Sequence, residues 1–431
     1  MVNKRLDATA SEHAAPKAPA LRSLLSRQPL RTLVHLFILI QVLFVQLPIR
    51  TIAYVLLPRL TRPHPQWPLG RSLLVKCLGS YRKNTRMLNI LSGRINKSVL
   101  PLVKVGAPAT PVWVPPIDGQ ATLEGDIKLW FDSAHCTTKR IPGFWYGRDH
   151  HAKNGVRRAK EGEKVFLFFH GGGYIEYSAH PSGPIAALPL LLLRASNKSP
   201  SPRAPKRLFA AEYRLSDETA FPGILADALA SWIYLVKDCS FKPENIVLAG
   251  DSAGGNLALA LARYLRDYRP LSKEGLFTSS SPIADSLLLF SPWVDLSLSH
   301  ASAGPSSSFN KHAKFEFLTI EGCITARDRL VVGLPPSVLR SRWMSAVCVN
   351  RETEEDLFDN FPRCIVVSGA LELFQDEIKA LVRHYETASK AGRSGQVEHV
   401  VEPLAGHDFT VVPFIYTEEN KRIEQRMARW L

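Results

Sequence analysis

The sequence predicts an α/β fold in which a mostly parallel central sheet is flanked by helices, because three observations agree. From about residue 160 onward, short apolar runs alternate with longer segments whose apolar residues recur at helical spacing. The short runs have the near-continuous apolar composition of strands that are buried on both faces of a parallel sheet. The chain has 431 residues, 45% of them hydrophobic, which suffices for one large domain of this class with extra segments.

The expected strands and helices follow in chain order. Strands are predicted at 165–169, 208–213, 246–249, 287–290, 363–368 and 397–401. Helices are predicted at 222–236, where Pro222 suits a first helical turn, and at 257–265, 377–388 and 418–430. This alternation predicts one α/β domain, the expected catalytic domain, over residues 160–431. A Ser-rich insertion at 297–345 interrupts it and is placed to form a lid or pocket wall. Residues 58–159 hold short apolar pieces broken by prolines and are interpreted as a cap or linker region.

The N-terminal part contains a separate apolar segment at 33–57. Its first part reads LVHLFILIQVLFVQL, and with its flanks it reaches the roughly 20 residues that a spanning helix needs. A membrane anchor is the favoured interpretation, although His35, Gln41 and Gln46 weaken it; a cleaved signal peptide and a buried helix are the alternatives. Basic residues stand on both sides, and those before the segment slightly favour a cytoplasmic N-terminus with a lumenal catalytic domain. Residues 1–32 are polar and are predicted to be a disordered tail.

Charge and cysteine usage restrict the possible partners. The formal net charge is +15, but the basic residues are scattered and carry no nucleic-acid-binding signature. Solvated loops and affinity for an anionic membrane surface are therefore expected, and nucleic-acid binding is not. The six cysteines include no C-x-x-C pair, so they do not predict a zinc site of that kind.

A candidate nucleophile lies in the segment AGDSAGG at 249–255. This G-x-S-x-G pattern follows a predicted strand and precedes a predicted helix, which is the context of a nucleophile elbow. Ser252 would sit in a sharp turn that needs nearly side-chain-free neighbours, which Gly250 and Gly254 supply, with Asp251 completing the motif. The N–H of Ala253, at the start of the helix, would favour developing negative charge. A purely structural glycine-rich turn is the alternative.

A second glycine-rich segment, HGGG at 170–173, directly follows the strand at 165–169. Consecutive glycines allow backbone N–H groups to approach a substrate oxyanion without interfering side chains. Gly171 and Gly172, with Ala253, are therefore predicted to form the oxyanion hole. His170 is expected to orient this loop rather than to act as a base.

The base and acid are sought downstream, because the chain order in this arrangement is serine, acid, histidine. His407 is the candidate base, since it lies in a loop just after the last strand. The other downstream histidines lie in the insertion, a helix or a strand: His300, His312, His384 and His399. Glu372, in the loop after the strand at 363–368, is the favoured acid. Asp376 begins the next helix, where it suits N-terminal capping, and stays the alternative.

These segments together resemble the hormone-sensitive lipase family of α/β-hydrolases over roughly residues 160–415. The resemblance rests on HGGGY at 170–174, EYRLSDETAFPGILADAL at 212–229, PENIVLAGDSAGGNLALALA at 243–262, LLLFSPWVDLS at 287–297, and the acid and histidine loops. It implies the α/β-hydrolase fold and hydrolysis of carboxylic esters through an acyl-serine, without metal or cofactor. The family pattern commonly has aspartate where Glu372 stands, which makes its assignment against Asp376 less secure.

The apolar N-terminal segment and Glu372 make the chain most similar, within that family, to fungal steryl acetyl hydrolases, which are membrane-anchored deacetylases of the endoplasmic reticulum. This resemblance implies an apolar alcohol acetate as substrate, such as a sterol or terpenoid ester. No obligate protein partner is expected from the sequence. A broader lipase or carboxylesterase for acylglycerols is an alternative. So is a catalytically silent receptor on the same fold; the plant gibberellin receptors have lost the triad histidine, whereas His407 is present here.

Overall fold

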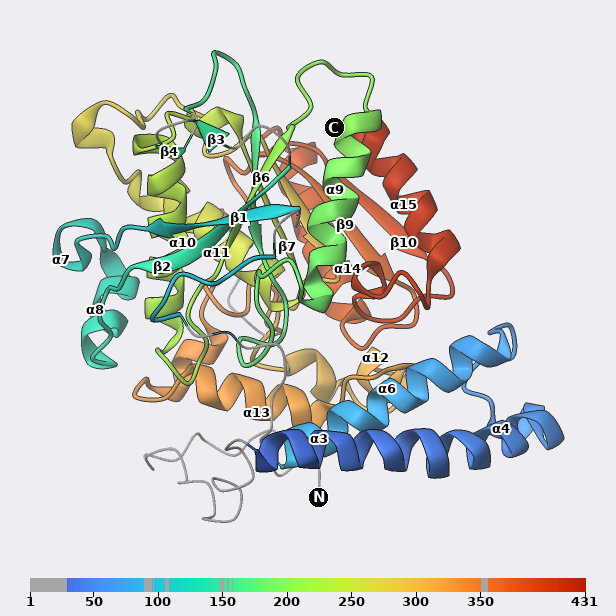
Figure 1. Ribbon diagram of the computed structural model, residues 1–431. Helices are drawn as coiled ribbons and strands as arrows, with labels where there is room; N and C mark the ends of the chain where they lie inside the picture. The colour runs from blue at the N-terminus through green and yellow to red at the C-terminus, as the bar shows by residue number, and fades with distance from the viewer. Residues whose placement is uncertain are drawn as a thin grey trace.

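The computed structural model describes residues 29–88, 95, 97–104, 108–147, 151–152, 155–156, 158–349 and 356–431. A central eight-stranded sheet has the order β1-β2-β6-β5-β7-β8-β9-β10 (Figure 1). The strands are β1 Ala109–Val114, β2 Ile141–Tyr146, β5 Val165–Phe169, β6 Arg207–Ala211, β7 Ile246–Asp251, β8 Ser286–Phe290, β9 Arg363–Gly369 and β10 Val397–Glu402. A separate two-stranded sheet pairs β3 His151–Ala152 with β4 Gly155–Val156.

The six predicted strands all occur in this sheet and pair in parallel with one another. The strand predicted at 208–213 ends at Ala211, and one further backbone hydrogen bond, from the N–H of Glu212 to the carbonyl of Pro142, joins it to β2. β1 and β2 were not predicted. They are antiparallel, and Pro111 and Pro142 interrupt their apolar pattern, which is tolerated at a sheet margin.

Helices cover both faces of the sheet, so the chain has the predicted α/β-hydrolase architecture. α9 Ala187–Lys198 and α15 Thr417–Trp430 pack together over one face, where Phe166, Val247 and Ile365 point. α10 Phe221–Lys237, α11 Ala253–Tyr268 and α14 Gln375–Lys390 cover the other face. The short elements are α7 Gly119–Thr122, α8 Gly125–Ser133, η2 Pro184–Ala186, η3 Pro243–Asn245, η4 Ser272–Glu274, η5 Ser299–Ala303, η6 Ala313–Phe315, η7 Pro336–Arg340 and η8 Phe409–Val411.

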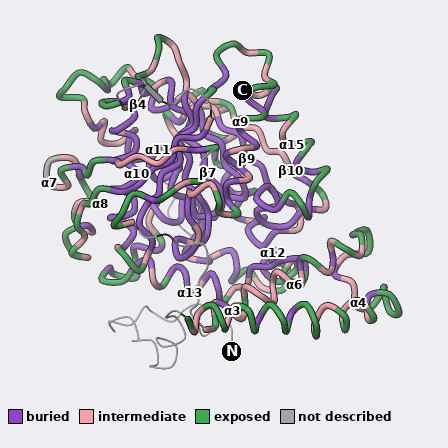
Figure 2. The backbone as a smooth tube through the Cα atoms, in the orientation of Figure 1, coloured by how far each residue is buried: buried purple, intermediate pink, exposed green. Residues whose placement is uncertain are grey.

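A layer of helices lies beyond one end of the sheet. α3 Leu30–Gln41, the π-helical turn η1 Val42–Gln46 and α4 Leu47–Leu56 form one long helix, followed by α5 Pro58–Thr61 and α6 Leu69–Met87. The predicted insertion contributes α12 Ser308–Lys311 and α13 Ile320–Leu330. In Figure 1, α6 runs between the long helix and the helices of the insertion. In Figure 2 the long helix is exposed along most of its outer side.

The long helix begins at Leu30, three residues before the predicted segment, so only residues 29–32 of the predicted tail are described. The rest of that tail lies outside the described residues. By length and composition, the long helix is apolar enough to cross a membrane. Only 11% of an apolar 18-residue stretch within it is buried in the protein. A core helix of a water-soluble domain would be mostly buried, so the described contacts do not favour that alternative.

Candidate active site

Ser252 occupies the sharp turn between β7 and α11. Its backbone has φ 51° and ψ −118°, a conformation that L-residues rarely adopt and that marks strain at functional turns. A Cβ on Gly250 would lie 2.3 Å from the carbonyl oxygen of Gly254, and one on Gly254 would lie 2.0 Å from that of Phe169. Both neighbours must therefore be glycine for the turn to pack against β5 and the start of α11.

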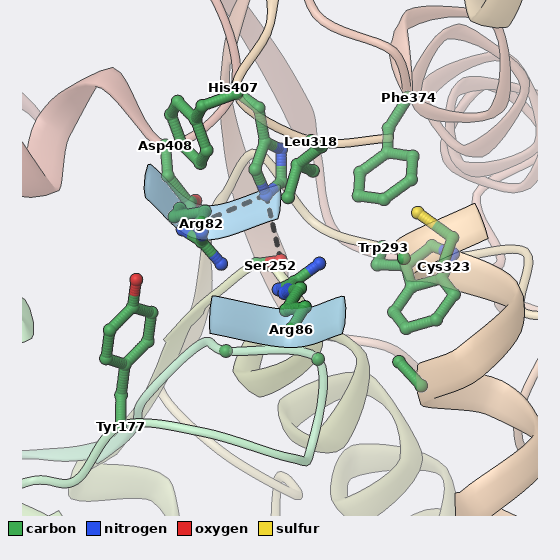
Figure 3. A pocket seen from close by; sticks show the side chains of 15 residues that line it. Arg82, Arg86, Tyr177, Ser252, Trp293, Leu318, Cys323, Phe374, His407 and Asp408 are labelled. Carbon is green, nitrogen blue, oxygen red and sulfur yellow. Dashed lines mark hydrogen bonds and ion pairs between the residues drawn. The ribbon is translucent and has the colours of Figure 1, made fainter. Parts of the chain in front are cut away.

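The three residues predicted from separate loops meet at this turn. His407 Nε2 lies 2.9 Å from Ser252 Oγ, and His407 Nδ1 lies 3.1 Å from Glu372 Oε2. Figure 3 shows the imidazole of His407 pointing to Ser252. Both distances are within hydrogen-bond range, and all three side chains are buried.

Asp376 does not take part in this arrangement. Its Oδ2 accepts a hydrogen bond from the N–H of Ser308 at 2.7 Å, at the start of α12. The residue lies in the first turn of α14, where a carboxylate complements the helix dipole. Asp376 therefore ties the insertion to α14, while Glu372 contacts the imidazole.

Glu316, which the sequence analysis missed, joins the acid loop to the histidine loop. Its Oε1 accepts the N–H of His407 at 2.8 Å and the N–H of Leu373 at 3.2 Å. No short motif surrounds Glu316, because its role depends on two loops that lie far away in the sequence. It comes from the insertion, so this segment also supports the site from behind.

Burial shifts the ionisation of the Glu372–His407 pair. It raises the pKa of Glu372 to about 7, opposed by the hydrogen bond from His407. It lowers the pKa of His407, opposed by the same hydrogen bond. Desolvation disfavours the charged form of each group, so at and above neutral pH the imidazole is unprotonated and can accept the serine proton.

The predicted role of Gly171 is corrected by its hydrogen bond. The N–H of Gly171 donates to Asp251 Oδ1 at 2.9 Å, so it is already used inside the protein. Gly172 and Gly173 instead line the pocket beside Ser252. Both have positive φ, and a Cβ on Gly172 would lie 2.2 Å from the carbonyl oxygen of Glu176. Ala253 is the first residue of α11, as the prediction requires.

His170 lies under the glycine loop. Its Nδ1 is 2.7 Å from the carbonyl oxygen of Gly171, and its ring stacks on Tyr213 with centroids 4.4 Å apart. Burial lowers the pKa of His170 to about 3, so the imidazole is neutral at physiological pH. These contacts fix the loop and leave His170 away from Ser252.

Asp408, next to the histidine, also contacts its ring. Asp408 Oδ2 lies 3.1 Å from His407 Nε2, on the same nitrogen that faces Ser252. Burial raises the pKa of Asp408 well above its usual range, which disfavours a competing charge at that nitrogen. Glu372 is therefore the carboxyl group that supports the far side of the ring.

The pocket above Ser252 is narrow, with a cavity volume of about 20 Å³. One wall is aromatic: Trp293 stacks on Phe374 at 5.7 Å, and Phe374 meets the His407 ring edge-on at 4.9 Å. α13 contributes a further apolar wall through Cys323 and Ala326.

The facing wall of the pocket comes from α6, which supplies Arg82 and Arg86 (Figure 3). Both guanidinium groups donate to Glu176 Oε1, in the loop that follows the glycines. The sequence analysis missed both arginines, because basic residues on a helix of unpredicted position carry no signal of what they face.

The chain is similar to known proteins of one family. A family model described as alpha/beta hydrolase fold matches residues 166–411. The chain is 29% identical over 147 residues to an acetyl-hydrolase of Streptomyces hygroscopicus, a match covering 34% of this chain and 42% of that protein. It is 27% identical over 277 residues to esterase LipU of Mycobacterium tuberculosis, covering 63% of this chain and 79% of that protein.

Two further matches are more distant or shorter. Human hormone-sensitive lipase is 25% identical over 126 residues, covering 28% of this chain and 11% of that protein. A solved structure of a hyperthermophilic esterase from Pyrobaculum calidifontis superposes with a TM-score of 0.52 at 18% identity, covering 84% of this chain and 92% of that one. The latter is a likeness of fold.

Proposed function

Because the chain belongs to the α/β-hydrolase family, in the group that contains hormone-sensitive lipase, we propose that it is a serine carboxylic ester hydrolase with Ser252, His407 and Glu372 as catalytic residues. One observation carries the proposal. A buried serine on a strained turn hydrogen-bonds a neutral imidazole, whose other nitrogen contacts a buried carboxylate. That arrangement provides a nucleophile, a base and a group that orients the base.

The reaction proceeds in two steps. Ser252 Oγ attacks the ester carbonyl while His407 Nε2 takes its proton, giving a tetrahedral oxyanion. The N–H groups of Gly172, Gly173 and Ala253 stabilise that oxyanion, and one such donor contributes about 3 kcal/mol. His407 then protonates the departing alcohol, leaving an acyl-serine. Water attacks this intermediate with His407 again as base, which releases the carboxylic acid and restores the serine.

The substrate we propose is a short-chain ester, an acetate above all, of an apolar alcohol such as a sterol or terpenoid. The cavity beside Ser252 is narrow, with a volume of about 20 Å³, which favours a small acyl group. The aromatic and aliphatic walls of the pocket favour an ester whose alcohol part is apolar. A relative named as an acetyl-hydrolase also supports acetate. Acylglycerol hydrolysis is the alternative within the enzyme class.

We also propose that the helix Leu30–Leu56 attaches the enzyme to a membrane, where apolar esters accumulate. An endoplasmic-reticulum location is supported by the resemblance of the sequence to steryl acetyl hydrolases.

The test combines an activity assay with covalent labelling. The purified full-length protein should hydrolyse nitrophenyl acetate faster than longer nitrophenyl esters, and should release a sterol from its acetate. Ser252→Ala should lower kcat by about 10⁵-fold or more and abolish labelling by a fluorophosphonate probe. Ser280→Ala, which removes an exposed hydroxyl, should change neither. Wild-type protein that binds ligand but neither labels nor turns over any ester would show a receptor instead.

A further inference from the structure

We propose that the helix Leu30–Leu56 lies in the plane of the membrane, within one leaflet, with the catalytic domain seated on its inner side. The proposed ester hydrolysis is compatible with a spanning helix and with an in-plane helix, so the orientation of the helix is a separate inference. The inference rests on how the two sides of this helix are occupied.

The outer side of the helix is a mostly apolar surface. Phe37 is 68% exposed, Phe44 73% and Leu56 71%, values that a core helix never shows. Soluble proteins rarely leave so large an apolar surface uncovered. The exposed apolar side chains of this surface are Leu33, Leu36, Phe37, Leu39, Ile40, Leu43, Phe44, Val45, Ile49, Ile52, Val55, Leu56, Leu57 and Leu60.

The inner side of the helix is bound to α6. Ile38 and Val42 are buried and pack near Cys77 and Tyr81 of α6. His35 Nδ1 lies 2.8 Å from Tyr81 Oη, and Arg50 Nη2 donates to Ser80 Oγ at 3.1 Å. Two of the polar residues of the apolar segment therefore have partners in the protein rather than in lipid. The helix therefore has one side packed on the protein and the opposite side free to meet lipid.

These contacts are incompatible with a helix that crosses the bilayer. α6 carries Arg71, Lys76, Arg82, Lys83 and Arg86, and it contacts α3, η1 and α4 in turn. If α6 stayed in place, a spanning helix would carry those charges into the hydrocarbon, which is costly. If α6 were left behind, Arg50 would enter the hydrocarbon without its hydroxyl partner.

α6 is also held firmly to the catalytic domain. Arg82 and Arg86 donate to the buried Glu176, and Trp67, just before α6, donates to the carbonyl of Leu404 at 2.9 Å. The long helix is thereby fixed along the surface of the domain. Its 27 residues span about 40 Å, so its length would permit either arrangement, and the contacts with α6 decide between them.

A lipid leaflet is the occupant that fits this surface. The exposed Arg59 lies between Leu57 and Leu60 at the end of the apolar surface, and the net charge of +15 favours anionic headgroups around it. A second copy of a chain with this charge would meet it with repulsion. In the in-plane arrangement α6, which lies beside the long helix in Figure 1, separates the leaflet from the pocket. Arg82 and Arg86 of α6 line this pocket together with Ser252, so the pocket lies at the membrane-facing end of the domain.

Depth-dependent fluorescence quenching tests the orientation. Leu36→Cys, Phe44→Cys and Ile52→Cys, each labelled with an environment-sensitive dye, are reconstituted as full-length protein into phosphatidylcholine–phosphatidylserine vesicles. Lipid-attached quenchers at several depths should report one common shallow depth for the three sites. A steady progression through the bilayer centre would overturn the proposal. Unsubstituted protein is the labelling blank, and Leu276→Cys, exposed on a distant loop, should show no lipid quenching.

Accessibility of the two chain ends gives an independent readout. With an epitope tag at each end, protease added outside sealed vesicles should remove both tags together or protect both together. Removal of only one tag from a uniformly oriented population would show a spanning helix. A protein that ignores protein-free vesicles and forms dimers would show a protein interface instead, and would also overturn the proposal. The Ser252→Ala protein should behave identically, which separates this test from that of the proposed activity.

Discussion

The strand ends and the cap, which consists of α6 and the insertion at 297–345, contribute to one pocket in different ways. Ser252, Glu372 and His407 each stand in a loop that leaves the carboxyl end of a parallel strand. Glu316, from the insertion, accepts from the histidine and acid loops, whereas Arg82 and Arg86, from α6, donate to Glu176 after the glycine loop. The comparison teaches that the reacting groups depend on local turns, whereas their support and enclosure depend on contacts between distant segments.

After Ser252→Ala, the largest loss of activity is expected from a change in the acid of the triad. Glu372→Gln should lower kcat/KM on nitrophenyl acetate by about 10³- to 10⁴-fold, because the amide no longer stabilises the imidazolium. Asp376→Asn should cost less than about tenfold, since its carbonyl oxygen can still accept from Ser308. The opposite ranking, with both variants folded by circular dichroism, would move the acid to Asp376.

The dependence of kcat/KM on pH should report the coupled titration of Glu372 and His407. Burial raises the pKa of Glu372 to about 7 and lowers that of His407, and both must be unprotonated for His407 to act as base. Lowering the pH through about 7 should therefore reduce kcat/KM, by about tenfold per unit once the pair has gained a proton. Asp376→Asn should keep the same acidic limb. An unchanged rate down to pH 5 would contradict the assignment.

A smaller effect is expected where the cap supports the strand ends. Glu316→Ala removes the acceptor shared by the N–H groups of His407 and Leu373 and should lower kcat by about tenfold. Burial raises the pKa of Glu316 to about 8, so Glu316→Gln keeps a neutral acceptor of the same shape and should restore most of the activity. Equal loss in both variants, with KM unchanged, would assign Glu316 a purely structural role.

The same division explains what the sequence could predict. Six strands and the triad candidates were predictable, because apolar runs and flanking glycines are short-range signals. The failure at Gly171 came from the side chain of Asp251, which a glycine motif does not reveal. β1 and β2 were hidden by prolines, and α6 by its mixed composition. Arg82 and Glu316 acquire their positions only when the cap folds onto the loops.

The bond between α6 and Glu176 has one more consequence. Glu176 lies three residues after the last glycine of the loop, so α6, which holds the proposed membrane helix against the domain, also completes a wall around the reacting serine. A shortened enzyme that began after α6 would keep its nucleophile but open its pocket on one side. The proposed membrane attachment and the shape of the pocket therefore both depend on α6, and removing this helix would change both.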